Sequence, residues 1–499
     1  MNVNRRDMTH TLLAAAFLAL CCGPAAWSEV RLPGLISSSM VLQQGRPVRI
    51  WGWADNGETV AVRFQNQAAV TAGKDGRWEV WLGPLEPGGP FTLGVNSVEL
   101  SDVLVGEVWV CSGQSNMEWP LSAVEESDRH IAAAGQPQIR LFSVPHVQAD
   151  QPRDDIEAKW EACTPETARE FSAVGYFFGR DLHQARGVPI GLIDSSWGGT
   201  PAEAWTRRQV LAEDPELRQL FAWCSQRDAE YEQALVEYAA LAAQAEREGK
   251  ERPGQPWRPW QPSVLYNGMI APLLPYAIRG VIWYQGESNA DRAEQYRRLF
   301  PAMIQNWRTD WRLGDFPFLA VQLAPFYEIQ PNPTDTNWAR LREAQLLATR
   351  LLPRVGLAVI TDVGDPKDIH PRRKEPVGAR LALAARTIAY GEPVTSSGPI
   401  CDWMEISGDR ARLHFQHADD GLVAGGEPLA GFAVAGPDRR FVWANAAIES
   451  DTVVVWHESV PNPVAVRYGW ADYPTGNLWN KAGLPASPFR TDSFPQTGR

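Results

Sequence analysis

The sequence predicts an α/β protein with a central, mostly parallel sheet and β-rich regions at both ends. Between about residues 101 and 392, short apolar segments alternate with longer amphipathic ones, which is the pattern of a doubly wound sheet. On either side, in residues 29–100 and 393–499, strand-length segments of alternating polarity are separated by turns rich in Gly, Asn and Asp. A chain of 499 residues has room for two or three domains of ordinary size.

The central region is expected to hold six buried strands and four helices. The expected strands are Val108–Cys111, Ile139–Val144, Ile190–Ile193, Gly280–Tyr284, Phe318–Leu323 and Leu357–Thr361. The expected helices are Phe171–Arg186, Tyr296–Asp310, Asn337–Leu352 and Pro376–Tyr390. Residues 205–262 interrupt the alternation. Glu216–Lys250 is rich in Ala, Glu, Gln and Leu and predicts a helical insertion that the Pro/Trp segment Arg252–Pro262 ends, and an insertion without a binding role is favoured.

The two flanking regions are typical of antiparallel β-sandwiches or jelly rolls. Period-two segments before the central region are Val48–Trp53, Thr59–Phe64 and Trp78–Trp81. Those after it are Ala411–Gln416, Gly431–Ala435 and Thr452–Trp456, followed by an irregular tail. Whether the two regions form one module or two is left open by the sequence.

Composition limits the classes of partner. The chain has 47 Lys and Arg against 59 Asp and Glu, a net charge of −12, and no dense basic run, so nucleic acid is not an expected partner. Its 44% apolar and 21% charged residues fit a globular protein without membrane spans. The 22 tryptophans supply flat aromatic faces that suit sugar rings, although core packing accounts for most of them.

Residues 1–28 have the form of a signal peptide, which predicts export to the periplasm or the outside of the cell. Arg5 and Arg6 precede an apolar run, Leu12–Cys22, and a small-x-small cleavage pattern ends at Ser28. A twin-arginine signal and lipidation at Cys21 are weaker interpretations of the same residues. The four other cysteines lie far apart without metal-ligand spacing, so disulfides and buried thiols both remain open: Cys111, Cys163, Cys224 and Cys401.

A candidate nucleophile follows the first central strand. There the apolar run ends in Cys-Ser-Gly-Gln-Ser-Asn-Met, a small turn that places Ser115 at the carboxyl end of the strand. Ligands of open α/β sheets bind at this edge, where such a turn presents a hydroxyl and backbone N–H groups. We therefore expect Ser115 to be the nucleophile.

His370 is the candidate general base. It follows the last central strand in a Gly-, Asp- and Pro-rich loop, with Asp368 two residues before it, close enough to orient the imidazole. The other histidines, His146 among them, lack a comparable strand-end position. A metal site is the less favoured interpretation of the loop, because no further ligands stand at matching spacing.

Two more strand ends offer hydrogen-bond donors for an oxyanion. Gln285 and Asn289 follow one strand and supply amide side chains. Gly198 and Gly199 follow another and supply accessible backbone N–H groups, which could act beside the N–H of Ser115. Nucleophile, base, acid and donors at one sheet edge favour a hydrolytic site.

Long motifs in the chain resemble the sialate O-acetylesterase family, a branch of the SGNH-type serine esterases. They are Met40–Gln44, Gly113–Met117, Asn267–Pro272, Trp283–Asn289, Asp368–Pro371 and Gly483–Arg490. The resemblance implies an SGNH-hydrolase-like three-layer α/β/α domain and an esterase that removes O-acetyl groups from carbohydrate without a metal or organic cofactor.

The same resemblance implies Ser115 as nucleophile, His370 as base and Asp368 as acid. The commonest pattern places the acid three residues before the histidine, where Lys367 stands, so Glu287 of the Gln-Gly-Glu block is the alternative acid. The block also favours Gln285 over Asn289 as the oxyanion amide.

The expected partner is an acetylated glycan. Sialic acid would find positive charge in Arg372–Lys374, although a solvated loop is the favoured interpretation, and acetylated xylan or xyloglucan suits an acidic, Trp-rich chain at least as well. The alternative from another class is a non-catalytic carbohydrate-binding protein on a degenerate esterase scaffold. The sequence does not indicate an oligomeric state.

Overall fold

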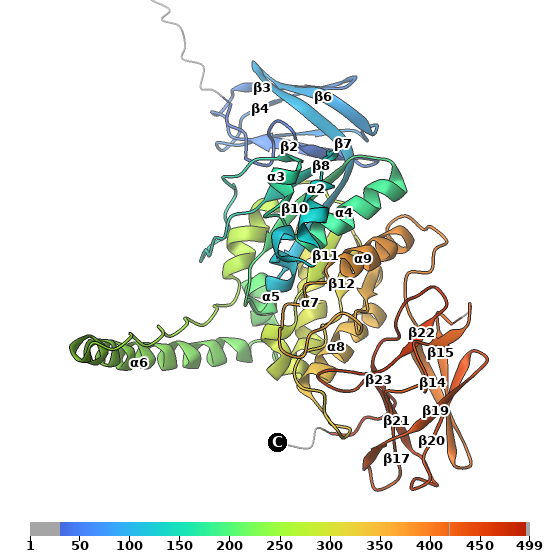
Figure 1. Ribbon diagram of the computed structural model, residues 1–499. Coiled ribbons are helices and arrows are strands. Elements are labelled where there is room, and N and C mark those ends of the chain that lie inside the picture. Colours follow the sequence, from blue (N-terminus) through green and yellow to red (C-terminus); the bar gives the residue numbers. More distant parts are fainter. Residues whose placement is uncertain (1–29, 419, 496–499) are drawn as a thin grey trace, which may run out of the picture.

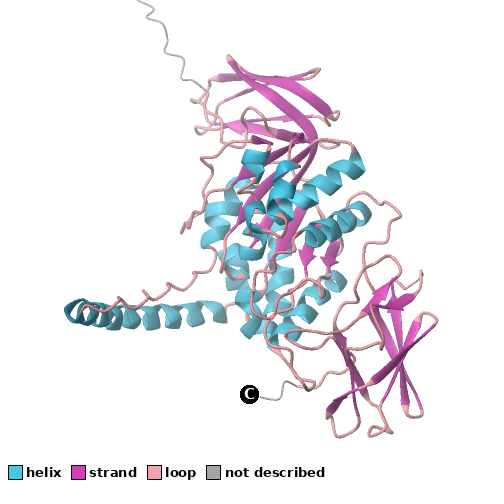
Figure 2. Ribbon diagram, viewed as in Figure 1, coloured by secondary structure: helices cyan, strands magenta, loops and turns pink. Residues whose placement is uncertain are grey.

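The computed structural model describes residues 30–418 and 420–495, so the expected signal peptide, with Cys21, lies outside the described residues. A β-rich region, a central α/β body and a second β-rich region follow one another along the chain (Figures 1 and 2). Mixed α/β structure with a mostly parallel central sheet is therefore confirmed, with antiparallel sheets on both sides.

The central sheet has the strand order β13-β12-β11-β7-β10-β8-β9. Its strands are β7 (Val98–Gly113), β8 (Gln136–Ser143), β9 (Glu161–Cys163), β10 (Ile190–Ser196), β11 (Gly280–Tyr284), β12 (Phe318–Val321) and β13 (Val355–Ala358). All neighbours pair in parallel except β9, a short antiparallel edge strand that the sequence did not predict. The last strand begins two residues before its expected start at Leu357.

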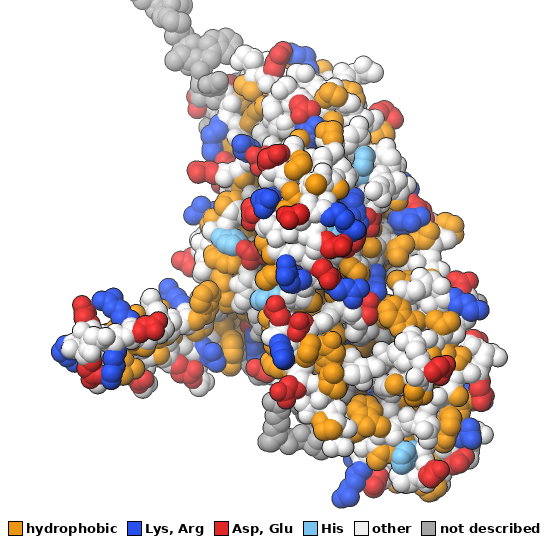
Figure 3. Space-filling model, viewed as in Figure 1, with side chains coloured by type: hydrophobic (Ala, Val, Ile, Leu, Met, Phe, Trp, Pro, Cys, Tyr) orange, Lys and Arg blue, Asp and Glu red, His pale blue; other side chains and the backbone are white. Residues whose placement is uncertain are grey.

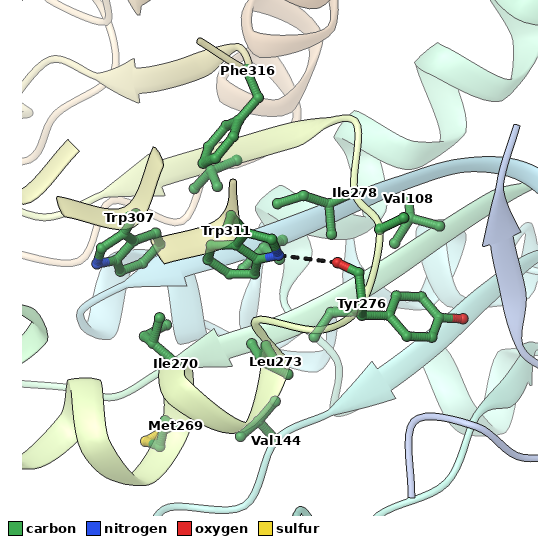
Figure 4. Packing of buried hydrophobic residues seen from close by; sticks show 14 of the residues in the cluster. Val108, Val144, Met269, Ile270, Leu273, Tyr276, Ile278, Trp307, Trp311 and Phe316 are labelled. Carbon is green, nitrogen blue, oxygen red and sulfur yellow. Dashed lines mark hydrogen bonds between the residues drawn. The ribbon is translucent and has the colours of Figure 1, made fainter. Parts of the chain in front are cut away.

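Helices cover both faces of this sheet. They are α4 (Ala173–Arg186) and α9 (Glu375–Ile388) on one face and α7 (Ala293–Trp311) and α8 (Asn337–Leu351) on the other. Alternate residues of β7 divide between the two cores: Val108 and Val110 pack with α7, whereas Trp109 and Cys111 pack with α4. Figure 4 shows the first of these cores, where the indole N–H of Trp311 donates to the Tyr276 carbonyl at 3.0 Å.

The N-terminal region forms two sheets, whose strands are β1 (Val41–Gln43), β2 (Val48–Gly52), β3 (Thr59–Phe64), β4 (Gln67–Ala72), β5 (Trp78–Leu82) and β6 (Gly88–Val95). One of the two sheets, that of β1, β3, β4 and β6, is joined to the central sheet by β7 itself, while β2 and β5 form a separate pair. The first half of β7 pairs with β6 and β1, and its second half pairs with β10 and β11. The boundary expected between residues 100 and 101 thus falls inside one strand, because an apolar strand can serve two sheets without any break in its pattern.

The helical insertion projects from the body as an arm (Figure 1). It contains α5 (Arg208–Glu213) and α6 (Gln219–Glu248), and residues 250–262 return to the body without regular structure. Only Leu220, Cys224 and Ala245 of the 30 residues of α6 are buried. Figure 3 shows acidic and basic side chains mixed along this arm.

The C-terminal region has its own core, and none of its described strands pairs with the N-terminal sheets. Two four-stranded sheets and one two-stranded sheet are formed by β14 (Ile400–Ser407), β15 (Arg410–Gln416), β16 (Leu422–Ala424), β17 (Phe432–Ala435), β18 (Phe441–Trp443), β19 (Asn445–Glu449), β20 (Thr452–Trp456), β21 (Ala465–Tyr468), β22 (Leu478–Asn480) and β23 (Phe489–Arg490). The region is fastened to the body by the buried Arg342 of α8, whose guanidinium donates to the carbonyls of Leu323 and Ala471, both at 2.7 Å.

The cysteines left open by the sequence are free, buried thiols: Cys111, Cys163, Cys224 and Cys401. Among the residues that the structure describes, no helix is long and apolar enough to cross a membrane.

Candidate active site

Three strand ends meet at one level of the central sheet. Gly113 at the end of β7 pairs with Ser196 of β10 on one side and with Tyr284 of β11 on the other. Gly113 has a φ of +136°, and a Cβ there would lie 2.1 Å from the Tyr284 carbonyl oxygen, so only glycine lets the chain turn at this point. The loops that follow all three strands therefore open on the same edge of the sheet.

Ser115 and His370 meet at this edge, although 255 residues separate them. Ser115 begins the one-turn helix α1 (Ser115–Glu118), and its Oγ lies 2.8 Å from His370 Nε2. The pair has the hydrogen-bond geometry that a serine nucleophile and its base require. The strand-end placement of both residues was predicted from the sequence.

His370 is held by its own loop and by an aromatic ring. Asp368 Oδ1 accepts the backbone N–H of His370 at 2.8 Å and lies 3.6 Å from its Nδ1, longer than a hydrogen bond. Trp119 stacks on the imidazole with 4.8 Å between the ring centroids. Burial, then the nearby charge of Lys374, lower the pKa of His370, while Asp368 opposes them. The imidazole is therefore neutral, and able to accept a proton, at neutral pH.

Glu287, the alternative acid, reaches the histidine loop through Asn116. Asn116 Nδ2 donates to Glu287 Oε1 at 2.6 Å and to the Ile369 carbonyl at 3.0 Å, and the ammonium of Lys374 donates to Asn116 Oδ1. Burial raises the pKa of Glu287 and lowers that of Lys374 to about 7. Glu287 thus supports the histidine loop indirectly, through Asn116, and does not contact the imidazole ring.

The side-chain amides of the two candidate oxyanion donors, Gln285 and Asn289, donate to other protein groups. Gln285 Nε2 donates to the Thr200 carbonyl at 3.2 Å and to Asn289 Oδ1 at 2.7 Å. Asn289 Nδ2 donates to Glu203 Oε2 at 2.9 Å. Neither amide hydrogen-bonds to Ser115 in this structure. Both hold the chain that follows the two glycines, because strand-end position alone does not fix the direction of a side chain.

The two candidate glycines differ in their bonding. The N–H of Gly198 donates to Glu118 Oε2 at 2.6 Å, and a Cβ on Gly198 would lie 3.2 Å from the Cβ of Ser115. Gly199 is exposed, with a φ of +71°. Within residues 30–418 and 420–495, no acceptor takes the N–H of Gly199 or of Ser115.

Sequence reasoning missed a cluster of aromatic side chains beside the glycine loop: His146, Trp197 and Trp260. His146 lies three residues after β8, a strand end that was predicted, and its Nε2 lies 3.0 Å from Glu118 Oε1. His146 stacks on Trp197, and Trp260 meets Trp197 edge to face with 5.0 Å between centroids. Because Trp260 belongs to the return segment of the arm, the insertion contacts Trp197, the residue before Gly198.

The basic side chains after His370 make contacts within the protein. Arg372 donates to the carbonyls of Ala123 and Val124, and Lys374 is buried. A hollow of about 280 Å³ beside His370 is lined by acidic as well as basic side chains, with Asp365 and Asp368 among them. In the described part of the chain, no three His, Cys, Asp or Glu side chains gather as metal ligands.

Comparison with known proteins identifies the family. The model of the carbohydrate esterases described as sialic acid-specific acetylesterase matches residues 105–248 and 249–385, more than half of the chain. The chain belongs to this carbohydrate esterase family. Sialate O-acetylesterases are similar along nearly their whole length: that of Mus musculus is 31% identical over 92% of this chain and 94% of its own, and that of Homo sapiens 30% identical over 95% and 94%.

A solved structure of a carbohydrate acetylesterase from Xanthomonas citri is also similar. It has 39% sequence identity and a TM-score of 0.81, and the match covers 93% of this chain and all of that one. As a carbohydrate esterase of this family, the protein is a carboxylic-ester hydrolase.

Proposed function

We propose that this carbohydrate esterase is an exported O-acetylesterase that removes acetyl groups from sugar hydroxyls through an acyl-enzyme, on an SGNH-type domain. The observation that carries the proposal is the 2.8 Å contact between Ser115 Oγ and His370 Nε2 at the carboxyl edge of the sheet. A neutral imidazole at that distance takes the serine proton as the oxygen attacks the acetyl carbonyl. The sugar alcohol leaves with this proton, and water then releases acetate from the serine by the same steps. The residues need no metal or organic cofactor for this chemistry.

Two backbone N–H groups are the proposed oxyanion donors. Those of Ser115 and Gly199 have no acceptor among the described residues, so both are available to the negative charge that develops on the carbonyl oxygen. Gln285 and Asn289 then act indirectly, since they hold Thr200 and Ala202 just beyond the glycines. The N–H of Gly198 already donates to the Glu118 carboxylate and is therefore not a proposed donor.

Asp368 is the proposed acid of the triad. Its carboxylate is the one nearest the free ring nitrogen of His370, at 3.6 Å, and closing that gap by less than 1 Å would form a hydrogen bond to the imidazolium. Catalytic hydrogen bonds are often long in a free enzyme and tighten when the substrate binds. Glu287 supports the same loop through Asn116 and Ile369.

An uncharged acetylated glycan is the proposed substrate class, with xyloglucan and xylan as its plant examples. Sialic acid carries a carboxylate, and the hollow beside His370 presents three acidic side chains, Glu125, Asp365 and Asp368, against two basic ones, Arg372 and Arg373, a balance that disfavours an anion. The nearby Arg372 is tied to the carbonyls of Ala123 and Val124, and Lys374 is buried under Trp119. The names of the curated relatives point to sialate instead, so the two classes have to be compared directly.

The test is release of acetate by the mature protein from acetylated xyloglucan, acetylated xylan and O-acetylated sialic acid, beside its Ser115→Ala and Ser122→Ala variants. We expect the two polysaccharides to be preferred, Ser115→Ala to lose turnover, and Ser122→Ala, which alters a neighbouring serine outside the site, to keep it. Full release by Ser115→Ala would overturn the mechanism, and preference for sialic acid would overturn the substrate class. Glycan binding without any release would establish the alternative, a non-catalytic carbohydrate-binding protein.

A further inference from the structure

The carboxylate of Glu118 ties the nucleophile helix to the glycine loop. Glu118 lies three residues after Ser115 on α1, and its Oε2 accepts the backbone N–H of Gly198 at 2.6 Å. The other oxygen, Oε1, lies 3.0 Å from His146 Nε2. One side chain therefore links three segments that follow three different strands: β7, β8 and β10.

The loop is fixed on its other side by Trp197. The indole stacks on His146 with 4.2 Å between ring centroids and 5° between the planes, and the Trp197 backbone N–H donates to the Gly113 carbonyl at 3.1 Å. Glu118, His146, Trp197 and Gly198 thus form a closed ring of contacts around the start of the glycine loop. Two consecutive glycines have wide conformational freedom, so a loop built on them needs such external contacts to hold one conformation.

The opposite charges of Glu118 and protonated His146 strengthen one contact in this ring. The hydrogen bond to Glu118 is the largest of the effects that together raise the pKa of His146, which strengthens the donor. Asp194, at the end of β10, faces the same cluster, and burial raises its pKa to about 7 while Ser196 Oγ donates to it at 2.6 Å.

We propose that Glu118 is a positioning residue for the oxyanion hole: by binding Gly198 N–H, it holds the loop in the conformation that leaves Gly199 N–H free for the substrate carbonyl. This inference rests on the proposed function, because it assumes that Ser115 is the nucleophile. Glu118 acts through the loop and does not itself contact the reacting atoms. Its loss should weaken binding of the transition state more than binding of the substrate.

The experiment compares Glu118→Ala and Glu118→Gln with the unaltered protein on a small acetyl ester, 4-nitrophenyl acetate, and on acetylated xylo-oligosaccharides. A lost oxyanion donor costs about 100-fold or more in kcat, so a loosened loop in Glu118→Ala should cost about 10- to 100-fold with KM changed less than about threefold. Glu118→Gln should recover most of the rate, because its amide oxygen can still accept the Gly198 N–H and its NH₂ can donate to neutral His146. Asp128→Ala, which alters an exposed carboxylate on the neighbouring helix α2 (Ser127–Ala132), serves as the control for charge alone.

Two results would overturn the proposal: an unchanged kcat in Glu118→Ala, or a Glu118→Gln variant as slow as Glu118→Ala. His146→Phe keeps the stack on Trp197 and removes the bond to Glu118 together with the hydrogen bond to the Ser196 backbone, so it extends the test if Glu118→Ala does not fold. We expect His146→Phe to lose about three- to tenfold in kcat, as a partial loosening of the loop. Full activity in this variant would remove the support that the ring of contacts gives to the inference.

Amide hydrogen exchange separates this inference from the proposed function. In a peptide covering residues 194–200, Glu118→Ala should speed exchange, since the acceptor of the Gly198 N–H is gone, whereas Ser115→Ala should leave it unchanged. Unchanged exchange in Glu118→Ala would refute the positioning role even if the esterase mechanism holds. Faster exchange together with an active Ser115→Ala variant would instead refute the mechanism and leave the loop contact in place.

Discussion

Trp119 lies almost parallel to His370, with ring centroids 4.8 Å apart and 15° between the planes. The indole N–H donates to the Ala123 carbonyl at 3.2 Å, which fixes the ring from its other end. The imidazole therefore stacks on an indole ring whose position is fixed by a hydrogen bond to the chain just after the nucleophile. Because the Asp368 carboxylate lies 3.6 Å from His370 Nδ1, too far for a hydrogen bond to the ring, the stack on Trp119 and the contact with Ser115 Oγ are what orient the imidazole.

Trp119→Leu should consequently impair catalysis more than folding. Loss of the flat surface lets the imidazole tilt away from Ser115, and we expect kcat to fall by about 10- to 50-fold, as for a misplaced catalytic group. Trp119→Phe, which keeps an aromatic face, should stay within about threefold of the parent. Steady-state kinetics on 4-nitrophenyl acetate, with thermal unfolding of each variant, measures both effects. Equal losses in the two variants would show that stacking is not what orients the ring.

The pH dependence should carry the signature of a histidine with a lowered pKa. Protonated His370 cannot accept the Ser115 proton, so kcat/KM falls on the acid side as the ring becomes charged. Burial and Lys374 both disfavour the cation, which moves this fall below the ordinary histidine pKa of about 6.5. A profile of kcat/KM between about pH 4.5 and 8 measures the midpoint. A midpoint well above 6.5 would contradict the electrostatics of the site.

Lys374→Met tests the cause of that shift. Removing a positive charge that disfavours the imidazolium raises the pKa of His370, so the acid limb of kcat/KM should move to higher pH. Arg373→Met removes a charge of the same sign from an exposed position one residue earlier and should move the limb less. The same series of pH profiles, recorded for both variants, gives the comparison. A limb that moves to lower pH in Lys374→Met would reverse the assigned sign.

Asp368 and Glu287 can be told apart by paired amide substitutions. Asp368→Asn removes the charge nearest the His370 ring, and we expect kcat to fall by on the order of 100-fold or more. Glu287→Gln keeps an oxygen that can accept from Asn116 and removes a buried charge, so we expect a loss of less than about tenfold. Burst and steady-state kinetics on 4-nitrophenyl acetate report the acylation and deacylation steps separately. A larger loss in Glu287→Gln would make Glu287 the acid of the triad.

The pairing of Ser115 with His370 could be predicted because it depends on strand order and strand ends. Apolar runs mark β7 and the strand before the His370 loop, and parallel strands bring their carboxyl ends to one edge whatever lies between them in the sequence. The same reasoning did not predict the partners of Gln285, whose amide donates to the Thr200 carbonyl and to Asn289 in a way that no local pattern records. A strand end predicts that a residue lies near the site but not where its amide points.

Contacts between distant loops were also out of reach of the sequence. His146 follows β8, yet its place beside Glu118 depends on the path of an irregular loop, and Trp260 arrives only because the projecting arm returns past Trp197. The continuity of β7 across the expected N-terminal boundary was out of reach for a different reason. Continuous apolar alternation hides the fact that β7 leaves one sheet and enters another near residue 106.

Gly113→Ala should be far more damaging than a glycine substitution elsewhere. The new methyl group would lie 2.1 Å from the Tyr284 carbonyl oxygen at a φ of +136°, so strand pairing at the base of the site must open, at a cost of at least about 3 kcal/mol. Gly187, the C-cap of α4, has a φ of +64° with open space around its Cβ position. Gly187→Ala should therefore cost only about 1–2 kcal/mol, the strain of the left-handed conformation. Urea denaturation followed by circular dichroism compares the two. Similar losses in both variants would mean that conformational strain, and not the contact with β11, makes glycine necessary at the nucleophile turn.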